Sequence, residues 1–307
     1  MTSAMRSSRA ALAIAIAVVV TASATPAQAS VAAKLTSGLP HSCAITSSAL
    51  AGCWGYDRFG EAHVPRNLGA ASDISARNDH TCAVTALRTV RCWGLNSYGQ
   101  TTVPADLGAA KRVATGGFHT CAVLIDKTVR CWGRDDYRQI EPPLDLGPVS
   151  EISAGYRFTC VILVAGTVRC WGAHTYGEAD VPLNLGTVTQ IDAGYYHTCA
   201  RTTAGYDWCW GHNLYGKSTV PSDLGQVISV AAGGQHSCAV TTAQTVRCWG
   251  PKSGTMFYGQ TVVPQTLGPA TAVSAGWQHT CVIKINGHVR CWGRNVSGVL
   301  TVPPSLR

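Results

Sequence analysis

The chain has 307 residues, a formal net charge of +8 and only 13% charged residues. Its lysines and arginines are scattered, whereas electrostatic nucleic-acid sites usually show a clustered basic stripe, so we expect no nucleic-acid partner. No segment reaches about 18 uninterrupted apolar residues, so we also expect no membrane-spanning helix.

The first residues have the features of an export signal. Two arginines precede an apolar run from Ala10 to Val20, and Ala27-Gln28-Ala29 forms a small-x-small cleavage site. We therefore predict a signal peptide over residues 1–29 and a secreted mature protein of residues 30–307. Removing the two arginines lowers the formal charge from +8 to +6.

Fourteen cysteines in an exported chain indicate disulfides, because oxidising compartments preserve them. The two cysteines of each pair are ten positions apart, and successive pairs begin 39 positions apart, with a last step of 43. The pairs are Cys43 and Cys53, Cys82 and Cys92, Cys121 and Cys131, Cys160 and Cys170, Cys199 and Cys209, Cys238 and Cys248, and Cys281 and Cys291. A structural zinc site would need thiols two to four residues apart, so we expect no metal and no cofactor.

Each unit of this repeat is interpreted as four short strands separated by turn residues. In the fifth unit the strands are expected at residues 187–193, 197–200, 207–210 and 218–220. In an antiparallel hairpin, Cys82 and Cys92 would face each other with Cα atoms about 4.5–5.5 Å apart, within reach of a disulfide. We therefore predict one disulfide per unit, joining two neighbouring strands.

The repeat fills the mature chain, so residues 30–307 are expected to form one domain. A period near 40 with four strands per unit favours a β-propeller. An open solenoid would need atypical polar units at its ends, but the first and last units resemble the middle ones, so the ring is expected to close. The prediction is an all-β, seven-bladed β-propeller of four-stranded blades, about 39 residues per repeat, acting as a monomer.

The repeated motif resembles that of a known family. The pattern Gly-x-x-His-Thr-Cys-Ala-Val, followed by Val-x-Cys-Trp-Gly-x-Asn-x-Tyr-Gly-Gln, is similar to the repeat of the regulator of chromosome condensation family. The resemblance implies a seven-bladed propeller, and secreted bacterial members include an inhibitor of β-lactamases with that shape. Paired cysteines replace the apolar residues usual in the family, and an export signal is incompatible with the nuclear members' role.

Three recurring side chains are interpreted as parts of the fold. The histidine before each first cysteine is assigned a structural hydrogen bond, the tyrosine before glycine a role in loop packing, and the arginine beside the second cysteine a blade-to-blade contact. The histidines are His41, His80, His119, His197, His236 and His279, with Phe158 in the fourth unit. The tyrosines are Tyr98, Tyr137, Tyr176, Tyr215 and Tyr258, and the arginines are Arg91, Arg130, Arg169, Arg247 and Arg290.

The two residues before each histidine vary between units and are rich in aromatic rings. Large rings and arginines on an exposed rim dominate binding energy at interfaces, so these loops are the candidate partner-binding site. The predicted site residues are Phe118, Tyr156, Arg157, Tyr195, Tyr196, Trp277 and Gln278. The alternative is that these rings only shield the central channel.

No nucleophile elbow, phosphate loop or His-Glu-x-x-His motif is present, so we expect no enzyme and no catalytic residues. The leading hypothesis is a secreted binding propeller that recognises an extracellular protein, with inhibition of an extracellular enzyme such as a β-lactamase as one version. A carbohydrate-binding lectin is the alternative. An extracellular hydrolase or lyase using Asp135 or His212 is the third hypothesis.

Overall fold

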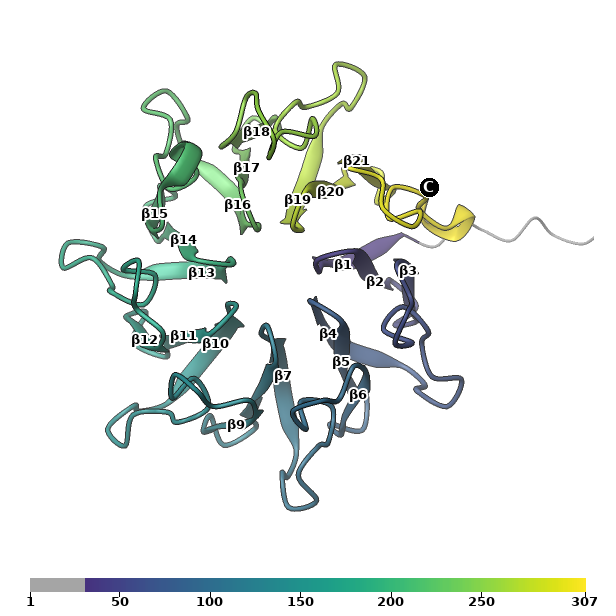
Figure 1. Ribbon diagram of the computed structural model, residues 1–307, viewed down its shortest axis with the longest axis vertical. Helices are drawn as coiled ribbons and strands as arrows, with labels where there is room; N and C mark the ends of the chain where they lie inside the picture. The colour runs from purple at the N-terminus through teal and green to yellow at the C-terminus, as the bar shows by residue number, and fades with distance from the viewer. Residues whose placement is uncertain (1–30) are drawn as a thin grey trace, which may run out of the picture.

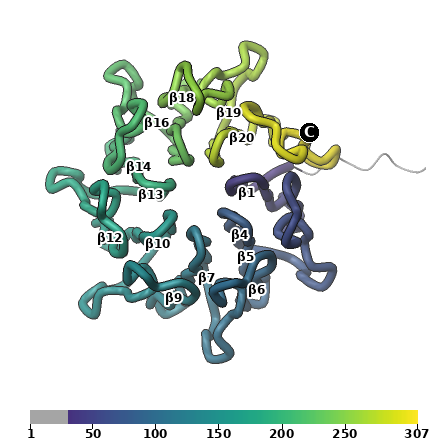
Figure 2. Tube along the Cα trace, in the orientation of Figure 1, coloured from purple at the N-terminus to yellow at the C-terminus, as the bar shows by residue number. Residues whose placement is uncertain are grey.

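The computed structural model describes residues 31–307. The predicted signal peptide lies outside the described residues. Seven three-stranded antiparallel sheets stand in a ring, each with its first strand at the axis and its third at the periphery (Figure 1, Figure 2). Residues of the inner strands line a central channel. The all-β class and the seven blades are thereby confirmed, and the described chain contains no helix long and apolar enough to cross a membrane.

The strands fall into three sets by their distance from the channel. The inner strands are β1 (Ala32–Ser37), β4 (Ala71–Arg77), β7 (Ala110–Thr115), β10 (Val149–Ala154), β13 (Val188–Ala193), β16 (Val227–Ala232) and β19 (Ala270–Ala275). The middle strands are β2 (His41–Thr46), β5 (His80–Thr85), β8 (His119–Leu124), β11 (Phe158–Leu163), β14 (His197–Thr202), β17 (Ser237–Thr241) and β20 (His279–Lys284). The outer strands are β3 (Ala51–Gly55), β6 (Val90–Gly94), β9 (Val129–Gly133), β12 (Val168–Gly172), β15 (Asp207–Gly211), β18 (Val246–Trp249) and β21 (Val289–Gly293).

The blades have three strands, not the four expected from the sequence. In the fifth unit, residues 218–220 form no strand. Val220 is followed by Pro221, and proline has no N–H with which to join a strand ladder. The chain turns instead, with the Leu224 N–H donating to the Pro221 carbonyl over 3.1 Å. Short 3-10 helices η1 (Leu214–Gly216) and η2 (Pro304–Leu306) complete the described structure.

The disulfide prediction is confirmed in every blade. Cys82 in β5 pairs directly with Cys92 in β6, and their Cα atoms lie 4.0 Å apart. All seven bridges join cysteines ten positions apart, with Cα distances of 4.0 or 4.1 Å. Each bridge therefore ties the middle strand to the outer strand of its own blade.

The ring closes, as predicted, by packing the C-terminal residues against the first blade. The indole N–H of Trp54 donates to the Val299 carbonyl over 2.9 Å, just as that of Trp93 donates to the Glu61 carbonyl over 3.0 Å in the next blade. Leu306 packs with Trp54 in a buried cluster that spans the first and last blades. The end of the chain thus supplies the contacts that the preceding unit supplies elsewhere.

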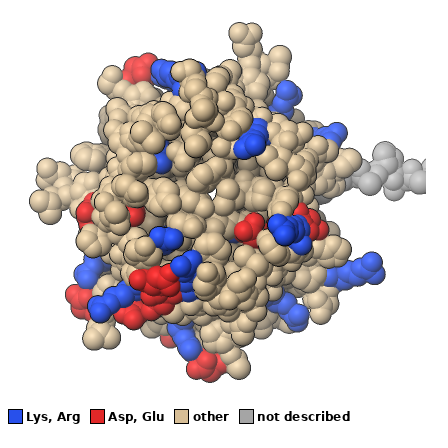
Figure 3. All heavy atoms as spheres, viewed as in Figure 1, with Lys and Arg blue, Asp and Glu red and all other residues tan. Residues whose placement is uncertain are grey.

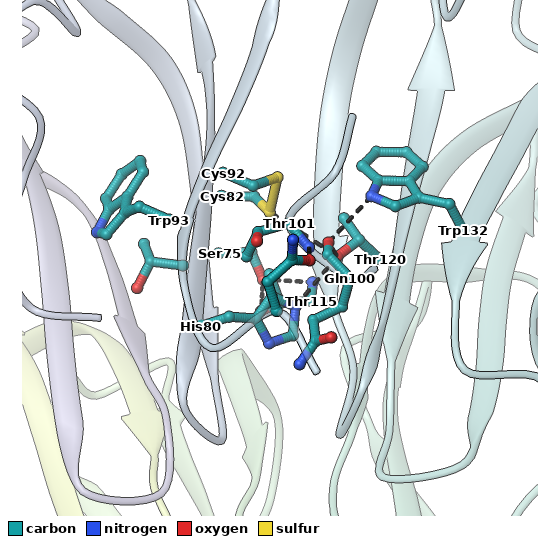
Figure 4. The surroundings of a disulfide bond; sticks show 12 residues. Ser75, His80, Cys82, Cys92, Trp93, Gln100, Thr101, Thr115, Thr120 and Trp132 are labelled. Atoms are coloured by element: carbon teal, nitrogen blue, oxygen red, sulfur yellow. Dashed lines mark hydrogen bonds between the residues drawn. A yellow bond between two sulfur atoms is a disulfide. The ribbon is translucent and has the colours of Figure 1, made fainter. Parts of the chain in front are cut away.

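In every blade except the fourth, a recurring histidine links the blade to the next, as Figure 4 shows around the bridge of β5 and β6. The Thr120 hydroxyl donates to the Gln100 carbonyl over 2.8 Å, so the His80 Nε2, 3.1 Å away, must donate to that hydroxyl. The indole of Trp132 donates to the same carbonyl over 3.0 Å. His80 is fully buried and burial lowers its pKa to about 3, so it is neutral. The structural interpretation of this histidine is confirmed.

Candidate binding face

Two loops of each blade meet on one face of the ring. The backbone N–H of Arg134, after β9, donates to the carbonyl of Phe118, before β8, over 2.9 Å. This approach requires Gly133, which has a φ of +106° and whose Cβ, if present, would lie 2.7 Å from the Phe118 oxygen. The glycine that follows the recurring tryptophan therefore lets the variable residues before the middle strand lie against the loop that follows the outer strand. The same backbone hydrogen bond occurs in every blade except the sixth, where Pro251 has no N–H to donate.

Five of the predicted site residues form one chain of touching rings. Phe118 lies 5.8 Å from Tyr156 between ring centroids, and Tyr156 is stacked on Tyr195 at 4.2 Å. Tyr195 contacts Trp277 edge-on at 4.1 Å, and Tyr196 contacts Tyr156 at 5.7 Å. Residues from the third, fourth, fifth and seventh blades thus share one aromatic surface, although up to 159 positions separate them in the chain.

Arginines lie between rings of successive blades. The Arg157 guanidinium is 4.7 Å from the Tyr137 ring centroid and 5.0 Å from that of Tyr156, and it donates to the Tyr137 hydroxyl over 2.7 Å. Arg134 likewise lies 4.6 Å from the Tyr98 ring centroid. The recurring tyrosines pack on these neighbours and still remain substantially exposed, at 46% for Tyr98 and 39% for Tyr137. These tyrosines therefore belong to the same face as the predicted site residues. Their recurrence in the loops next to the variable residues is the sequence signal that indicates this placement.

The fifth blade adds two titratable side chains, His212 and Lys217, beside the aromatic rings. Tyr176 contacts Tyr196 at 5.3 Å and His212 at 4.5 Å between ring centroids. The Lys217 ammonium lies 5.9 Å from the Tyr196 ring centroid. Burial lowers the pKa of Lys217 to about 8, and burial and the charge of Lys217 together lower the pKa of His212. We define the aromatic face as Tyr98, Phe118, Arg134, Tyr137, Tyr156, Arg157, Tyr176, Tyr195, Tyr196, His212 and Trp277.

Comparison of the sequence with protein-family models decides its relationship. Six segments match the family described as regulator of chromosome condensation (RCC1) repeat, and together they cover more than half of the chain. They are residues 71–100, 110–139, 149–178, 188–217, 227–260 and 270–299. The chain belongs to the RCC1 repeat family. Its first RCC1-type unit lies outside these matches but forms the same three strands and the same disulfide.

Solved structures with the same fold include two plant ectodomains. That of the Physcomitrella patens receptor kinase CR4 has a TM-score of 0.71 at 23% identity, covering 86% of this chain and 74% of that one. The CRINKLY WD40 ectodomain of the Arabidopsis thaliana receptor kinase ACR4 has a TM-score of 0.69 at 20% identity, and the match covers 86% of this chain and 98% of that one. Prp20p of Saccharomyces cerevisiae has a TM-score of 0.53 at 15% identity, and the match covers 88% of this chain and 74% of that one. Comparison with curated proteins finds no match.

Two predicted site residues of this RCC1-type propeller lie at the mouth of the central channel. Tyr195 and Trp277 line a very small cavity there, together with Arg77 and Asn78. Burial raises the pKa of Tyr195. These two rings therefore narrow one end of the channel while they continue the aromatic face.

Gln278, the seventh predicted site residue, has little accessible surface. It is only 7% exposed, and its side-chain oxygen accepts a hydrogen bond from Arg294 over 2.7 Å. This hydrogen bond indicates that Gln278 orients the Arg294 side chain.

In the space-filling view, acidic and basic side chains gather over the blades of β9 and β12, whereas mostly uncharged residues occupy the centre (Figure 3).

The groups that could suggest catalysis or metal binding have structural partners. Asp136 pairs with Arg134, which lowers the pKa of Asp136, and Asp135 accepts the Ile140 N–H over 3.2 Å. The one cluster of three potential metal ligands within residues 31–307 is Cys199, Asp207 and Cys209. Its two sulfurs form a disulfide and so cannot act as thiolate ligands.

Proposed function

We propose that the mature protein is a secreted, non-catalytic binding propeller that recognises an extracellular protein through its aromatic face. The observation that carries the proposal is the continuous chain of rings and arginines across five blades, from Tyr98 in the second to Trp277 in the seventh. Tyrosine, tryptophan and arginine are the side chains that most often dominate interface energies. Seven disulfides support an oxidising, extracellular location.

The rigidity of the face supports tight binding. Its loops are tied together by backbone hydrogen bonds, such as the 2.8 Å bond from the His212 N–H to the Tyr196 carbonyl. Its arginines are already held between rings. Binding would therefore order few additional side chains, and each side chain that needs no ordering saves about 0.5–1.5 kcal/mol. A preformed face of this kind suits a folded protein partner.

One concrete version of this function is inhibition of an extracellular enzyme. The resemblance of the repeat to that of secreted bacterial inhibitors makes a β-lactamase the first target to assay. An inhibitor needs only to cover an active site, which a broad, rigid face can do without catalytic groups. Loss of β-lactamase activity on adding the mature protein would support this version, and unchanged activity would leave the partner to be found by capture.

Tyr156 offers the sharpest test of the face, because it contacts three other rings and Arg157. We expect Tyr156→Ala to weaken binding of a captured extracellular protein about 30-fold, corresponding to about 2 kcal/mol. Tyr206→Ala is the matched control, since Tyr206 is an exposed tyrosine in the β14–β15 turn at the other end of the blade. Equal affinity of both variants, with unchanged melting temperatures, would contradict the proposal.

A glycan remains the second candidate ligand. Exposed tyrosines recur in successive blades at equivalent positions, which would give a lectin several similar sites. Competition of partner capture by a free sugar, with several equivalent sites, would favour the lectin. Formation of a one-to-one protein complex that sugars do not displace would favour the protein partner. We favour this outcome because most rings of the face pack against one another, which leaves little ring surface on which a sugar could stack.

A further inference from the structure

An apolar pocket lies on the aromatic face where the seventh blade meets the first. Its volume is about 240 Å³, and its apolar walls are Leu39, Pro40, Trp277, Val296 and Val299. Trp277 belongs to the aromatic face, where its ring contacts that of Tyr195. We call this cavity the seam pocket.

The repeat pattern explains why the pocket occurs at this seam. Between the second and third blades the equivalent space is filled by Tyr98, whose ring centroid lies 5.3 Å from that of Phe118. Between the fourth and fifth blades, Tyr176 and Tyr196 make the same contact at 5.3 Å. At the seam, serine stands at the position of the recurring tyrosine, at residue 297, and Pro40 replaces the opposing ring. The seam pocket is the space that two missing side chains leave.

A cation without a carboxylate partner stands at the pocket. Arg294 lines it, is exposed, and is held by its hydrogen bond to Gln278 and by the Tyr258 ring, whose centroid is 4.5 Å away. Within residues 31–307 no carboxylate lies within 4 Å of this guanidinium. The equivalent Arg134 is, by contrast, paired with Asp136. The seam pocket therefore combines apolar walls with one available positive charge.

We propose that the seam pocket receives one leucine-sized apolar side chain of the protein partner, with a neighbouring carboxylate of that partner paired to Arg294. This inference rests on the proposed function and specifies the chemistry of the partner at one point of the face. The size fits, because an apolar cavity of about 150 Å³ is enough to hold benzene. An aliphatic or aromatic anchor seated in a pocket is a common centre of a binding interface, and arginine is enriched among the residues that dominate its energy.

The probe for the test is isocaproate, which carries the leucine isobutyl group and a carboxylate on one short chain. Ligand-observed NMR with the mature protein should show saturable binding with a Kd of roughly millimolar order. We expect Val296→Tyr, which places a ring at the pocket, to weaken this binding at least about tenfold. Ser97→Tyr, at the equivalent position of the second unit, should leave it unchanged, because Tyr98 and Phe118 already fill that seam.

The charge is tested separately with isocaproamide, the neutral analogue. Arg294→Gln should weaken isocaproate binding several-fold and leave isocaproamide binding unchanged, because only the carboxylate uses the guanidinium. Failure of isocaproate to bind would overturn the proposal. So would equal binding by Val296→Tyr and the unmodified protein, given melting temperatures that show both to be folded.

Measurements of partner affinity then distinguish a failure of this inference from a failure of the proposed function on which it rests. Tyr156 is not a wall of the seam pocket, so Tyr156→Ala should weaken the partner and not isocaproate. If Val296→Tyr leaves partner affinity unchanged while Tyr156→Ala lowers it, the seam pocket is not an anchor and the binding face stands. If Tyr156→Ala has no effect, the proposed function fails first.

Discussion

Lys217 is the residue at which one unit departs most sharply from the chemistry of the repeat. In the second unit, the same position is Gln100, whose side-chain oxygen accepts the Tyr98 backbone N–H over 2.9 Å and closes the loop. Lysine cannot accept a hydrogen bond. Its ammonium is fully buried and donates to the Gly234 carbonyl over 3.2 Å. The fifth unit therefore has a buried charge where five other units have a glutamine or glutamate that closes the loop as an acceptor, and the seventh unit has Val299.

We expect Lys217→Gln to raise the free energy of unfolding at pH 7 by about 2 kcal/mol. Burial lowers the pKa of Lys217 from 10.5 to about 8, so below pH 8 the ammonium is charged in both states and the folded state bears the full cost of burying it. This cost disappears as the pH rises from 8 to 10.5. Denaturant titration at pH 7 and at pH 10 measures both the gain and its loss at high pH.

The matched control for this prediction places the same charge in another blade. Gln100→Lys should lower the free energy of unfolding at pH 7 by a similar amount, because Gln100 is also fully buried. If Lys217→Gln were no more stable than the unmodified protein, the buried ammonium would not be destabilising, which would contradict this prediction.

At the scale of the element, the unit that folds is a hairpin closed by a disulfide. Each blade has only three short strands, and its inner strand depends on packing against the neighbouring blades, as the buried clusters shared between blades show. The bridge between the middle and outer strands adds stability mainly by restricting the unfolded chain. This contribution compensates for the small core of each blade.

Removing one bridge should therefore have a moderate and local effect. We expect the double substitution Cys82→Ala and Cys92→Ala to lower the free energy of unfolding by about 2–3 kcal/mol, the value for a loop of roughly ten residues. Guanidinium titration of the oxidised protein is the measurement. The same loss is expected for Cys160→Ala with Cys170→Ala, because the geometry is repeated. A large difference between the two blades would show that the bridges are not equivalent.

At the scale of the whole molecule, six buried histidines join every blade except the fourth to the next one, and the contact from His279 to Ser42, over 2.9 Å, joins the last blade to the first. Each donates to a hydroxyl of the next blade, and burial lowers the pKa of every one of them. The pKa falls to about 3 for His41, His80, His119 and His236, to about 4 for His279, and well below its ordinary range for His197. In the folded protein these six histidines therefore stay neutral at pH values at which the unfolded chain protonates them.

This difference in histidine protonation makes the free energy of unfolding fall in acid. Above pH 6.5 the histidines are neutral in both states and the stability is fully present; as the pH falls below 6.5, only the unfolded chain gains protons, and stability is lost. At pH 5 the loss is roughly 2 kcal/mol per histidine, comparable in sum to the whole stability of a domain. Asp207, whose pKa burial raises to about 8, opposes the trend, and so do Glu61, Asp79 and Asp192, whose pKa values burial also raises. Melting temperatures measured from pH 7.5 to pH 4.5 should fall steeply.

The fourth blade provides the control for the acid prediction. Phe158 stands in place of the histidine there and is fully buried, while the hydroxyl of the next blade, on Thr198, still donates to the Glu178 carbonyl over 2.8 Å. His119→Phe should fold and should reduce the number of protons taken up on unfolding by about one between pH 5 and pH 6. Equal melting temperatures at pH 5 and pH 7.5 in the unmodified protein would contradict the account.

Much of the fold could be predicted because its determinants are local. The disulfide pairing follows from ten-residue spacing within one hairpin, and ring closure follows from the similarity of the first and last units. The fourth strand was expected wrongly, because Val220 and its neighbours have the composition of a strand. The N–H groups of Ser218 and Thr219 instead donate within the loop, to the Asn213 side chain and the Gly216 carbonyl, and Pro221 cannot extend a ladder because it has no N–H.

The sequence by itself determined the repeat, the hairpins, the bridges and the loops on which the variable aromatic residues lie, since all of these depend on residues close together in the chain. Only the tertiary structure decided which of those residues touch. Tyr195 and Trp277 meet across the channel mouth, and the seam pocket opens between the first and last blades, because closing the ring brings together side chains that no spacing rule relates. Local geometry is written in the sequence spacing, whereas the contacts of a closed ring depend on how all seven blades pack at once.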